Sequence, residues 1–372
     1  MHRSSIELQN LIEPQKPSFC QTRVTGSTGL NVLSLFDGMS CGQIALQKAG
    51  IKVNHYFASE IKPHAIKVTQ HNFPNTIQLG SVLDVKASDL PKIDLLIGGS
   101  PCQDFSSANK EKLGLQGEKS SLFYEYLRLL QELKPTYWLL ENVVMDAEQE
   151  MIISELVGTE PVRINSSLLS AQLRDRLYWT NIGPASYDLF GNRTCAIPLP
   201  KDKKIKLQDV LEDGFTDREK SRALLESDSR PLRTPTKMFH RYYSTGFTTV
   251  VFKDENIYRE MKKRYEEGLP GEAQQLNPST ESGGQQPYMQ NRVYSDKGKA
   301  PCLTQFADRL MVFQKENIRY LTQTELERLQ TVPEGYTSIL KRDDAACLLG
   351  DGWTVDAIAY IFSFLKGEGK KY

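Results

Sequence analysis

The 372-residue sequence has no excess charge of either sign, no long apolar run and no paired cysteines. Lys and Arg number 46 and Asp and Glu also number 46, which excludes a uniformly basic nucleic-acid-binding tail. No run of about 18 apolar residues occurs, and residues 1–29 lack the apolar core of a secretory signal, so we expect no membrane contact and a reducing compartment. The six cysteines form no CxxC pair, which predicts neither a disulfide framework nor a metal site.

Between residues 30 and 183, β-rich runs alternate with amphipathic stretches, which is the pattern of a parallel sheet covered on both faces. The predicted strands are residues 31–36, 53–60, 76–82, 93–99, 136–142, 163–169 and 176–182. Residues 42–50 and 121–133 repeat apolar side chains at helical spacing and end near Gly50 and Pro135. The sequence therefore predicts an α/β fold with a doubly wound, mostly parallel sheet.

The composition changes after Pro184, where polar loop residues increase and the periodicity weakens. Residues 184–300 hold 20 Lys and Arg against 17 Asp and Glu, so bulk charge does not mark a nucleic-acid binder. Residues 229–253, however, contain no acid and interleave cations with rings, which suit phosphates and bases respectively. The candidate contacts are Arg230, Arg233, Lys237, Arg241 and Tyr242. A solvated loop with a small aromatic cluster is the alternative.

Helical periodicity returns near the C-terminus, in residues 322–330 and 355–366. The apolar positions of both segments match helices that could pack back on the first sheet. We therefore expect the C-terminal segment to belong to the first domain.

The first candidate site is FDGMSCG (36–42), placed between a predicted strand and a predicted helix. Its two glycines allow backbone N–H groups to approach a ligand at the helix N-terminus. The next strand ends at Glu60, roughly 20 residues beyond the turn, where a carboxylate can accept hydrogen bonds from both hydroxyls of a ribose. A structural turn and a surface acid explain the features singly, but together they indicate an adenosine-containing ligand.

The second candidate site begins with GGSPCQDFS (98–106), directly after an apolar strand. A cysteine is most often a small buried hydrophobe, but Cys102 lies in a polar loop at a strand end, which favours a thiol nucleophile. Glu141 closes another apolar strand, and a partly desolvated acid there can keep a proton near neutral pH. Arg174 and Arg176 alternate at a strand entry, so both can face one side, with surface salt bridges as the alternative.

FDGMSCG, SE, GGSPCQDFS, ENV and QLRDR, in this order and spacing, resemble the motif series of the cytosine-C5 DNA methyltransferases. The resemblance continues through residues 291–304, 319–337 and 348–361, so that it covers about 30–183 and 291–366. The block around Trp353 and the run LLENVV resemble most the animal de novo DNA methyltransferase branch. The resemblance implies a Rossmann-like fold of the class I S-adenosylmethionine-dependent methyltransferases.

The resemblance implies methyl transfer from S-adenosylmethionine to C5 of a cytosine that is flipped out of double-stranded DNA. It assigns the Cys102 thiolate to addition at C6, a protonated Glu141 to N3 and Arg174 to O2, with Arg176 also in the catalytic set. Gln103 and Ser106 are expected to follow the flipped nucleotide.

The resemblance also implies a cofactor site formed by Phe36, Asp37, Gly38, Gly42, Glu60, Ser81, Ser100, Pro101, Asp351 and Trp353. The first four surround the methionine and sulfonium end, and Glu60 binds the ribose. The family usually has an aspartate at the position of Ser81, to accept a hydrogen bond from the adenine amino group. A neutral hydroxyl is the weaker partner, and Asp84 is the alternative acceptor.

The expected organisation is a leader (1–29), a catalytic and cofactor-binding domain (30–183), a target-recognition region (184–300) and a C-terminal segment that packs on the catalytic domain (301–372). We expect no metal, and a restriction endonuclease partner and the oligomeric state stay open. The expected location is the cytoplasm of a bacterial or phage-infected cell, or the nucleus of a eukaryotic one.

Two other functions are considered. The transfer-RNA methyltransferase branch shares the chemistry, but it has Pro-Pro-Cys-Gln where this chain has Ser-Pro-Cys-Gln. A catalytically silent DNA-binding regulatory relative would have lost the cysteine or the cofactor turn, and this sequence retains both.

Overall fold

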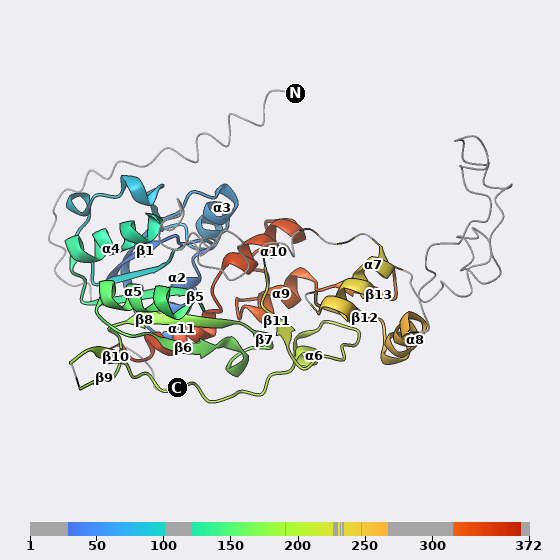
Figure 1. Cartoon of the computed structure of the whole chain (residues 1–372). Coiled ribbons are helices and arrows are strands. Elements are labelled where there is room, and N and C mark those ends of the chain that lie inside the picture. The colour runs from blue at the N-terminus through green and yellow to red at the C-terminus, as the bar shows by residue number, and fades with distance from the viewer. Residues whose placement is uncertain are drawn as a thin grey trace, which may run out of the picture. The chain divides into compact units, whose positions relative to one another are not determined.

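The computed structural model describes residues 29–100, 121–189, 191–225, 230, 232, 234–246, 248–266 and 315–365. Its contacts divide the chain into two compact units, whose elements are labelled in Figure 1. Unit 1 comprises Met1–Val210, Glu219–Arg230 and Thr322–Tyr372, and unit 2 comprises Leu211–Arg218 and Pro231–Leu321. These boundaries differ from those expected from composition, because residues 184–210 and 219–230 belong to unit 1.

Unit 1 contains a seven-stranded sheet in the order β3-β2-β1-β4-β5-β8-β6. Its strands are β1 (Leu30–Leu35), β2 (Val53–Ser59), β3 (Ile77–Gln78), β4 (Leu95–Gly99), β5 (Tyr137–Val143), β6 (Val162–Asn165) and β8 (Asp175–Thr180). All neighbouring strands pair in parallel except β8, which is antiparallel to β5 and β6. The predicted doubly wound, mostly parallel sheet is therefore confirmed.

Two strands are shorter than predicted because polar side chains cap turns inside the predicted runs. The Ser81 hydroxyl accepts a hydrogen bond from the Leu83 amide at 3.3 Å and starts a 3₁₀ turn soon after β3. The Asn165 side chain accepts from the Ser167 amide at 2.9 Å and ends β6 in the same way. Such local hydrogen bonds compete with strand pairing.

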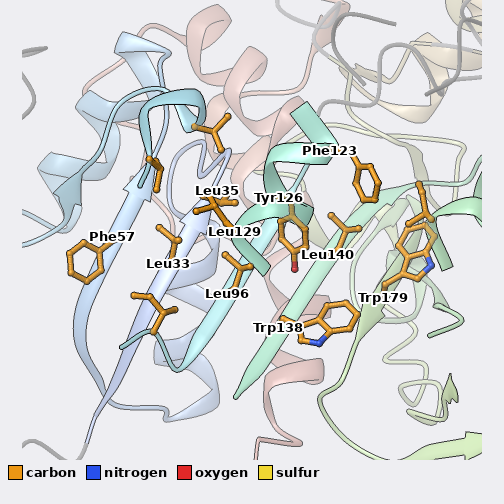
Figure 2. Packing of buried hydrophobic residues seen from close by; sticks show 14 of the residues in the cluster. Leu33, Leu35, Phe57, Leu96, Phe123, Tyr126, Leu129, Trp138, Leu140 and Trp179 are labelled. Atoms are coloured by element: carbon orange, nitrogen blue, oxygen red, sulfur yellow. The ribbon is translucent and has the colours of Figure 1, made fainter. Parts of the chain in front are cut away.

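One face of the sheet is covered by α4 (Ser121–Leu133) and α5 (Ala147–Val157), which contribute to the main core. Figure 2 shows α4 side chains over the strands, with the core members Leu33, Leu35, Phe57, Leu96, Phe123, Tyr126, Leu129, Trp138, Leu140 and Trp179 labelled. Strands buried on both faces read as continuous apolar runs, which is why they could be located from the sequence.

On the other face, α2 (Cys41–Ala49) packs against β4 and α11 (Val355–Phe362) packs against α2. The remaining helices of this unit include α3 (Pro63–Asn72), α9 (Gln323–Leu329) and α10 (Arg342–Asp351). Residues 342–362 are long and apolar enough to cross a membrane, but a turn at 352–354 interrupts them. Most of their surface is buried inside the protein, so they form part of the core.

The sheet order reverses between β1 and β4. Connections leave these two strands in opposite directions, and open α/β sheets bind ligands in the crevice outside the carboxyl ends of such strands. The 36–42 turn follows β1 at this edge, and Gly99 ends β4 there. Glu141 lies opposite Gly99 in the β4–β5 register, so the two candidate sites share one edge of the sheet.

Unit 2 has its own small core. α7 (Pro235–His240) continues into a π-helical turn (Arg241–Thr245), and β12 (Val250–Phe252) pairs antiparallel with β13 (Ile318–Tyr320), with α8 (Glu255–Glu266) beside β12. The buried residues are Met238, Phe239, Tyr242, Val250, Phe252, Met261 and Ile318. Arg218 donates to the carbonyls of residues 242, 246 and 248, and its guanidinium lies 3.9 Å from the ring centroid of Tyr242.

Asp356 of α11 forms ion pairs with Lys48 of α2 and with Lys203. Its carboxylate lies 2.7 Å from Lys48 Nζ and 2.9 Å from Lys203 Nζ. Burial opposes the charge on Asp356, but the two lysines outweigh burial and lower its pKa. Asp356→Asn should therefore lower the free energy of unfolding at neutral pH by about 1 to 2 kcal/mol, because these pairs are partly exposed.

A lowered pKa stabilises the fold above the ordinary aspartate value of 3.8, and this stabilisation is lost as the pH falls. Urea unfolding at several pH values should show a difference between wild type and variant that persists down to about pH 4 and shrinks only as the pH falls further. Asp343→Asn, at an exposed ion pair with Arg342, is the matched control. An equal loss in both variants would contradict a special role for the cluster.

Candidate functional site

The turn between β1 and α2 has an unusual backbone. Phe36, Gly38 and Ser40 all have positive φ, at 57°, 59° and 61°. Non-glycine residues adopt this region only when their surroundings hold them there, and such residues concentrate at functional sites. A Cβ added at Gly38 would meet no described atom within 4 Å, so this side of the turn has room for a ligand among the described residues.

Glu60 fixes this turn to the end of β2. Its Oε2 accepts a hydrogen bond from the Gly38 amide at 2.8 Å, and its Oε1 accepts from the amides of Ile61 and Lys62 at 2.7 and 2.8 Å. A carboxylate has about four acceptor positions, so Glu60 is held in place and can still accept further donors.

The ionised form of the Asp37 side chain is disfavoured at the same turn. It accepts hydrogen bonds from the Tyr56 hydroxyl, at 2.8 Å, and from the Ser40 hydroxyl. Burial raises the pKa of Asp37 to about 6, although hydrogen bonds from Ser40, Ser34 and Tyr56 oppose the rise. A nearby cation would favour the charged form, so the turn is suited to a positively charged ligand.

Glu141 lies in a compact cluster at the edge of β5. It is buried, with one oxygen 3.0 Å from Arg176 Nε and the other accepting from Trp353 Nε1 at 3.0 Å. Trp353 comes from the turn between α10 and α11, more than 200 residues along the chain. The structure thus brings three predicted site residues together by contact. Ser100 directly follows β4 and accepts a hydrogen bond from buried Asn142 at 3.1 Å.

Gly99 allows the indole and the carboxylate to approach. A Cβ added at Gly99 would lie 2.8 Å from Glu141 Oε2 and 2.9 Å from Trp353 Nε1. Both distances are shorter than real Cβ contacts, so any side chain here would displace one of the partners.

The Arg174 side chain lies in different surroundings from that of Arg176. The predicted alternation fails because residue 174 falls between β7 (Gln172–Leu173) and β8, outside either strand. Arg174 is buried, and its guanidinium donates to the carbonyls of Leu224, Gly350 and Gly352 at 3.2, 3.1 and 2.9 Å. The expected arrangement, with both guanidinium groups on one side of a strand, is therefore corrected: Arg176 is the arginine paired with Glu141.

The other predicted cofactor residues have varied surroundings. A Cβ at Gly42 would lie 2.5 Å from Ile97 Cδ1, which explains the glycine by close packing. Asp351 is exposed and pairs with Lys62 Nζ at 2.6 Å. Ser81 is half-buried and uses its hydroxyl as a turn cap, whereas Asp84 is exposed.

Several predicted residues lie outside the described part of the chain: Pro101, Cys102, Gln103, Ser106 and Arg233. Of the predicted nucleic-acid contacts, Arg230 and Lys237 are exposed and Arg241 is half-buried. Tyr242 is corrected, because it is 2% exposed in the core of unit 2 and cannot reach a nucleic acid in this conformation. Among the residues described, no group of three or more His, Cys, Asp or Glu side chains could hold a metal ion.

The sequence prediction missed residues that support the 36–42 turn. The Tyr336 hydroxyl donates to the Met39 carbonyl at 2.6 Å, and the Thr69 hydroxyl lies 3.2 Å from the Ser40 hydroxyl. Ser34 is a buried polar position in the apolar run Val32–Leu35, a signal that could have identified it. Tyr336 offered no such signal, because it is distant in sequence from the turn.

A comparison with protein families decides the assignment. Residues 30–150 and 166–367 match the model described as C-5 cytosine-specific DNA methylase. The chain belongs to this family. The predicted resemblance is therefore confirmed, while the finer likeness to the animal de novo branch stays a prediction.

Relatives within the family include phage and bacterial enzymes. The orphan methyltransferase M.SPRI of Bacillus phage SPR is 27% identical over 301 residues, covering 74% of this chain and 64% of the relative. The type II methyltransferase M.NgoBV of Neisseria gonorrhoeae is 36% identical over 208 residues, covering 50% of this chain and 47% of the relative. The chain thus spans about half to two thirds of the length of these curated relatives.

Solved methyltransferases of the family share the fold. The Entamoeba histolytica methyltransferase EhMeth has a TM-score of 0.59 at 14% identity, covering 92% of this chain and 100% of that one. The S. pombe Dnmt2 methyltransferase has a TM-score of 0.55 at 16% identity, covering 90% and 97%. At these identities the likeness shows the fold alone, and it confirms the Rossmann-like class I methyltransferase fold.

The raised pKa of Asp37 predicts a gain in stability on its removal. A carboxyl group whose pKa rises from 3.8 to about 6 on folding destabilises the ligand-free protein above pH 6, by as much as about 3 kcal/mol. This penalty is absent below pH 3.8 and grows as the pH rises through about 6. Asp37→Asn should therefore be more stable than wild type at pH 7.5, with a difference that shrinks as the pH falls to 4.

Urea unfolding of the ligand-free protein at several pH values measures this effect. The exposed Asp84→Asn serves as the control and should show no such pH-dependent gain. A stability difference between Asp37→Asn and wild type that is the same at pH 4 and pH 7.5 would contradict the assignment.

Proposed function

We propose that this chain transfers a methyl group from S-adenosylmethionine to C5 of a cytosine in double-stranded DNA, through a covalent bond between Cys102 and C6. The observation that carries the proposal is the contact among Glu141, Arg176 and Trp353. This cluster lies at the sheet edge where β4 ends. Ser100 follows the end of β4, and Cys102 comes two residues after Ser100 in the sequence. A buried acid beside a cation is what the reaction needs at that place.

The chemistry follows from the electron demand of the pyrimidine ring. Addition of the Cys102 thiolate to C6 places negative charge on the ring, which a proton at N3 and a cation at O2 would stabilise. Glu141 is suited to N3, and Arg176 to O2, because the pair is already held at 3.0 Å. After methyl transfer, solvent or a base takes the proton from C5, and the bond between C6 and the Cys102 sulfur breaks with the sulfur leaving as thiolate, which restores the aromatic ring and the free enzyme. The target base must leave the duplex stack, since C5 and C6 are otherwise covered.

The residues around the 36–42 turn fit the cofactor that the family uses. S-adenosylmethionine supplies the electrophilic methyl group on a sulfonium cation. Asp37 offers an anion whose charged form a cation would stabilise, and Glu60 offers fixed acceptors for the ribose hydroxyls. The open side of Gly38 provides room for the ligand next to these acids. At position 81, the serine offers the adenine amino group a neutral hydroxyl oxygen in place of a carboxylate.

The residues proposed to contact the DNA backbone lie in unit 2. Lys237 is exposed and Arg241 is half-buried, and neither has an acidic partner among the described residues. On α8, by contrast, Arg259, Lys262 and Arg264 pair with acids of the same helix. Unneutralised cations bind phosphates best, so α7 and the turn after it are the better candidates.

The names of the relatives favour DNA modification over the transfer-RNA alternative. Those relatives are type II and orphan methyltransferases from bacteria and phages. A restriction endonuclease partner and the cell compartment stay predictions from the sequence.

Cys102→Ala should abolish methyl transfer, because no other group in the proposal can add to C6. Transfer of tritium from labelled S-adenosylmethionine to duplex DNA or to transfer RNA measures both activity and substrate. Duplex DNA containing 5-fluorocytosine should trap wild type covalently, since the C5 fluorine blocks the elimination step.

Cys347→Ala is the matched control, since it removes a thiol from α10 and should leave turnover unchanged. Full activity of Cys102→Ala would refute the mechanism. Transfer to transfer RNA alone would support the other branch, and tight DNA binding without transfer by wild type would support a regulatory relative.

Lys237→Ala and Arg241→Ala should weaken DNA binding with little dependence on sequence. Each should make the slope of log affinity against log salt shallower by about one phosphate contact. Fluorescence anisotropy over a salt series measures this slope. Lys262→Ala, which removes an already paired cation, is the control, and unchanged slopes in both test variants would exclude α7 and its turn from the interface.

A further inference from the structure

Arg174 is a buried cation that donates hydrogen bonds to three backbone carbonyls. Its Nη1 donates to the carbonyls of Leu224 and Gly350, and its Nη2 donates to the carbonyl of Gly352. Gly350 and Gly352 flank Asp351, and Gly352 directly precedes Trp353. A guanidinium presents several donors in one rigid plane, so it can fix two neighbouring carbonyls with different nitrogens at once.

We propose that Arg174 is a positioning residue that holds Gly350–Gly352, the end of α10 and the first residue after it (called here the 350–352 turn), and thereby sets the Trp353 indole against Glu141. The chain of contacts is continuous. Arg174 Nη2 binds Gly352 at 2.9 Å, the next residue is Trp353, and its Nε1 donates to Glu141 Oε2 at 3.0 Å. Arg174 thus acts on the acid through the backbone of another segment, and its function differs from that of Arg176.

Two glutamines strengthen this interpretation. Gln330 is fully buried and donates to the Leu349 carbonyl at 2.5 Å, while its own carbonyl oxygen accepts from the Thr354 hydroxyl at 2.9 Å. These contacts hold both ends of the same turn. Gln172 Nε2 lies 3.3 Å from Gln330 Oε1 and therefore links this network to the strand just before Arg174.

The same network also holds a connecting segment. β11 (Ser221–Arg222) pairs with β7, and the Leu224 amide donates to Gln172 Oε1 at 2.8 Å while its carbonyl accepts from Arg174. In the chain, residues 219–230 connect the two segments that make up unit 2. Arg174 is therefore bonded both to the turn that carries Trp353 and to the segment through which the chain enters and leaves unit 2.

A direct role at O2 and a positioning role make different predictions. A residue that only contacts the target base acts once DNA is bound. A residue that holds the 350–352 turn affects Trp353 in the free protein, before any ligand is present. It should also affect the cofactor, because Asp351 and Trp353 belong to the cofactor site; this second effect rests on the proposed function.

Fluorine NMR of the full chain labelled with 5-fluorotryptophan separates the two roles. The protein has three tryptophans, so three resonances are expected, and Trp353→Phe assigns one of them. In ligand-free Arg174→Gln we expect the Trp353 resonance to shift or broaden, while those of Trp138 and Trp179 stay in place and report an intact core.

Titration calorimetry with S-adenosylmethionine provides the second readout. Arg174→Gln should bind the cofactor about tenfold more weakly than wild type. Arg163→Gln is the matched control, because it removes an exposed arginine paired with Asp175 on neighbouring strands and should change neither readout. Arg174→Lys keeps the charge, but a point charge on a shorter stem cannot serve residues 350 and 352 with separate nitrogens, so it should show smaller changes of the same kind.

If Arg174→Gln does not fold, Arg174→Lys carries the test. An unchanged Trp353 resonance and wild-type cofactor affinity in the folded variant would overturn the proposal and return Arg174 to a role at the base. Absence of cofactor binding by wild type would instead count against the proposed function, and the resonance of Trp353 in the ligand-free protein would still decide the positioning role.

Discussion

The buried carboxylate of Glu141 depends on donors from two distant parts of the chain. Arg176 reaches it from the antiparallel strand β8, and Trp353 reaches it from the turn between α10 and α11. A buried carboxylate is costly unless it is paired and hydrogen-bonded, so these donors must be in place whenever the site is formed. This requirement explains why the C-terminal helices pack within unit 1 beside the parallel strands, and why a second layer of polar contacts fixes the 350–354 turn.

Glu141 and Asp37, the two acids discussed at the site, differ in the groups that stabilise them. Glu141 is held by an ion pair and an indole, whereas the partners of the Asp37 carboxyl group within the described part of the chain are hydroxyl groups, and its pKa is raised. The hydroxyl groups orient Asp37 without neutralising it, so the ligand-free protein retains an unfavourable charge at the turn. Such a group suits a site whose ligand is a cation, because binding then relieves a cost that folding alone leaves in place.

Much of the fold was predictable because buried parallel strands are continuous apolar runs. The motif blocks also placed Glu60, Glu141 and Trp353 at one edge of the sheet. The roles of Arg174 and Arg176 were not separable, because alternation assumes a continuous strand and residue 174 interrupts it. Tyr242 was misjudged although its spacing from Met238 and Phe239 is that of a buried helical face, a pattern that outweighs the surrounding cations.

The close approach at Gly99 has an evolutionary consequence. A hydrogen at position 99 leaves space for the indole of Trp353 beside Glu141, and a methyl group would occupy that space. Because a side chain at position 99 would also press against Glu141, homologous chains that keep both the acid at 141 and the tryptophan at 353 should retain glycine at 99.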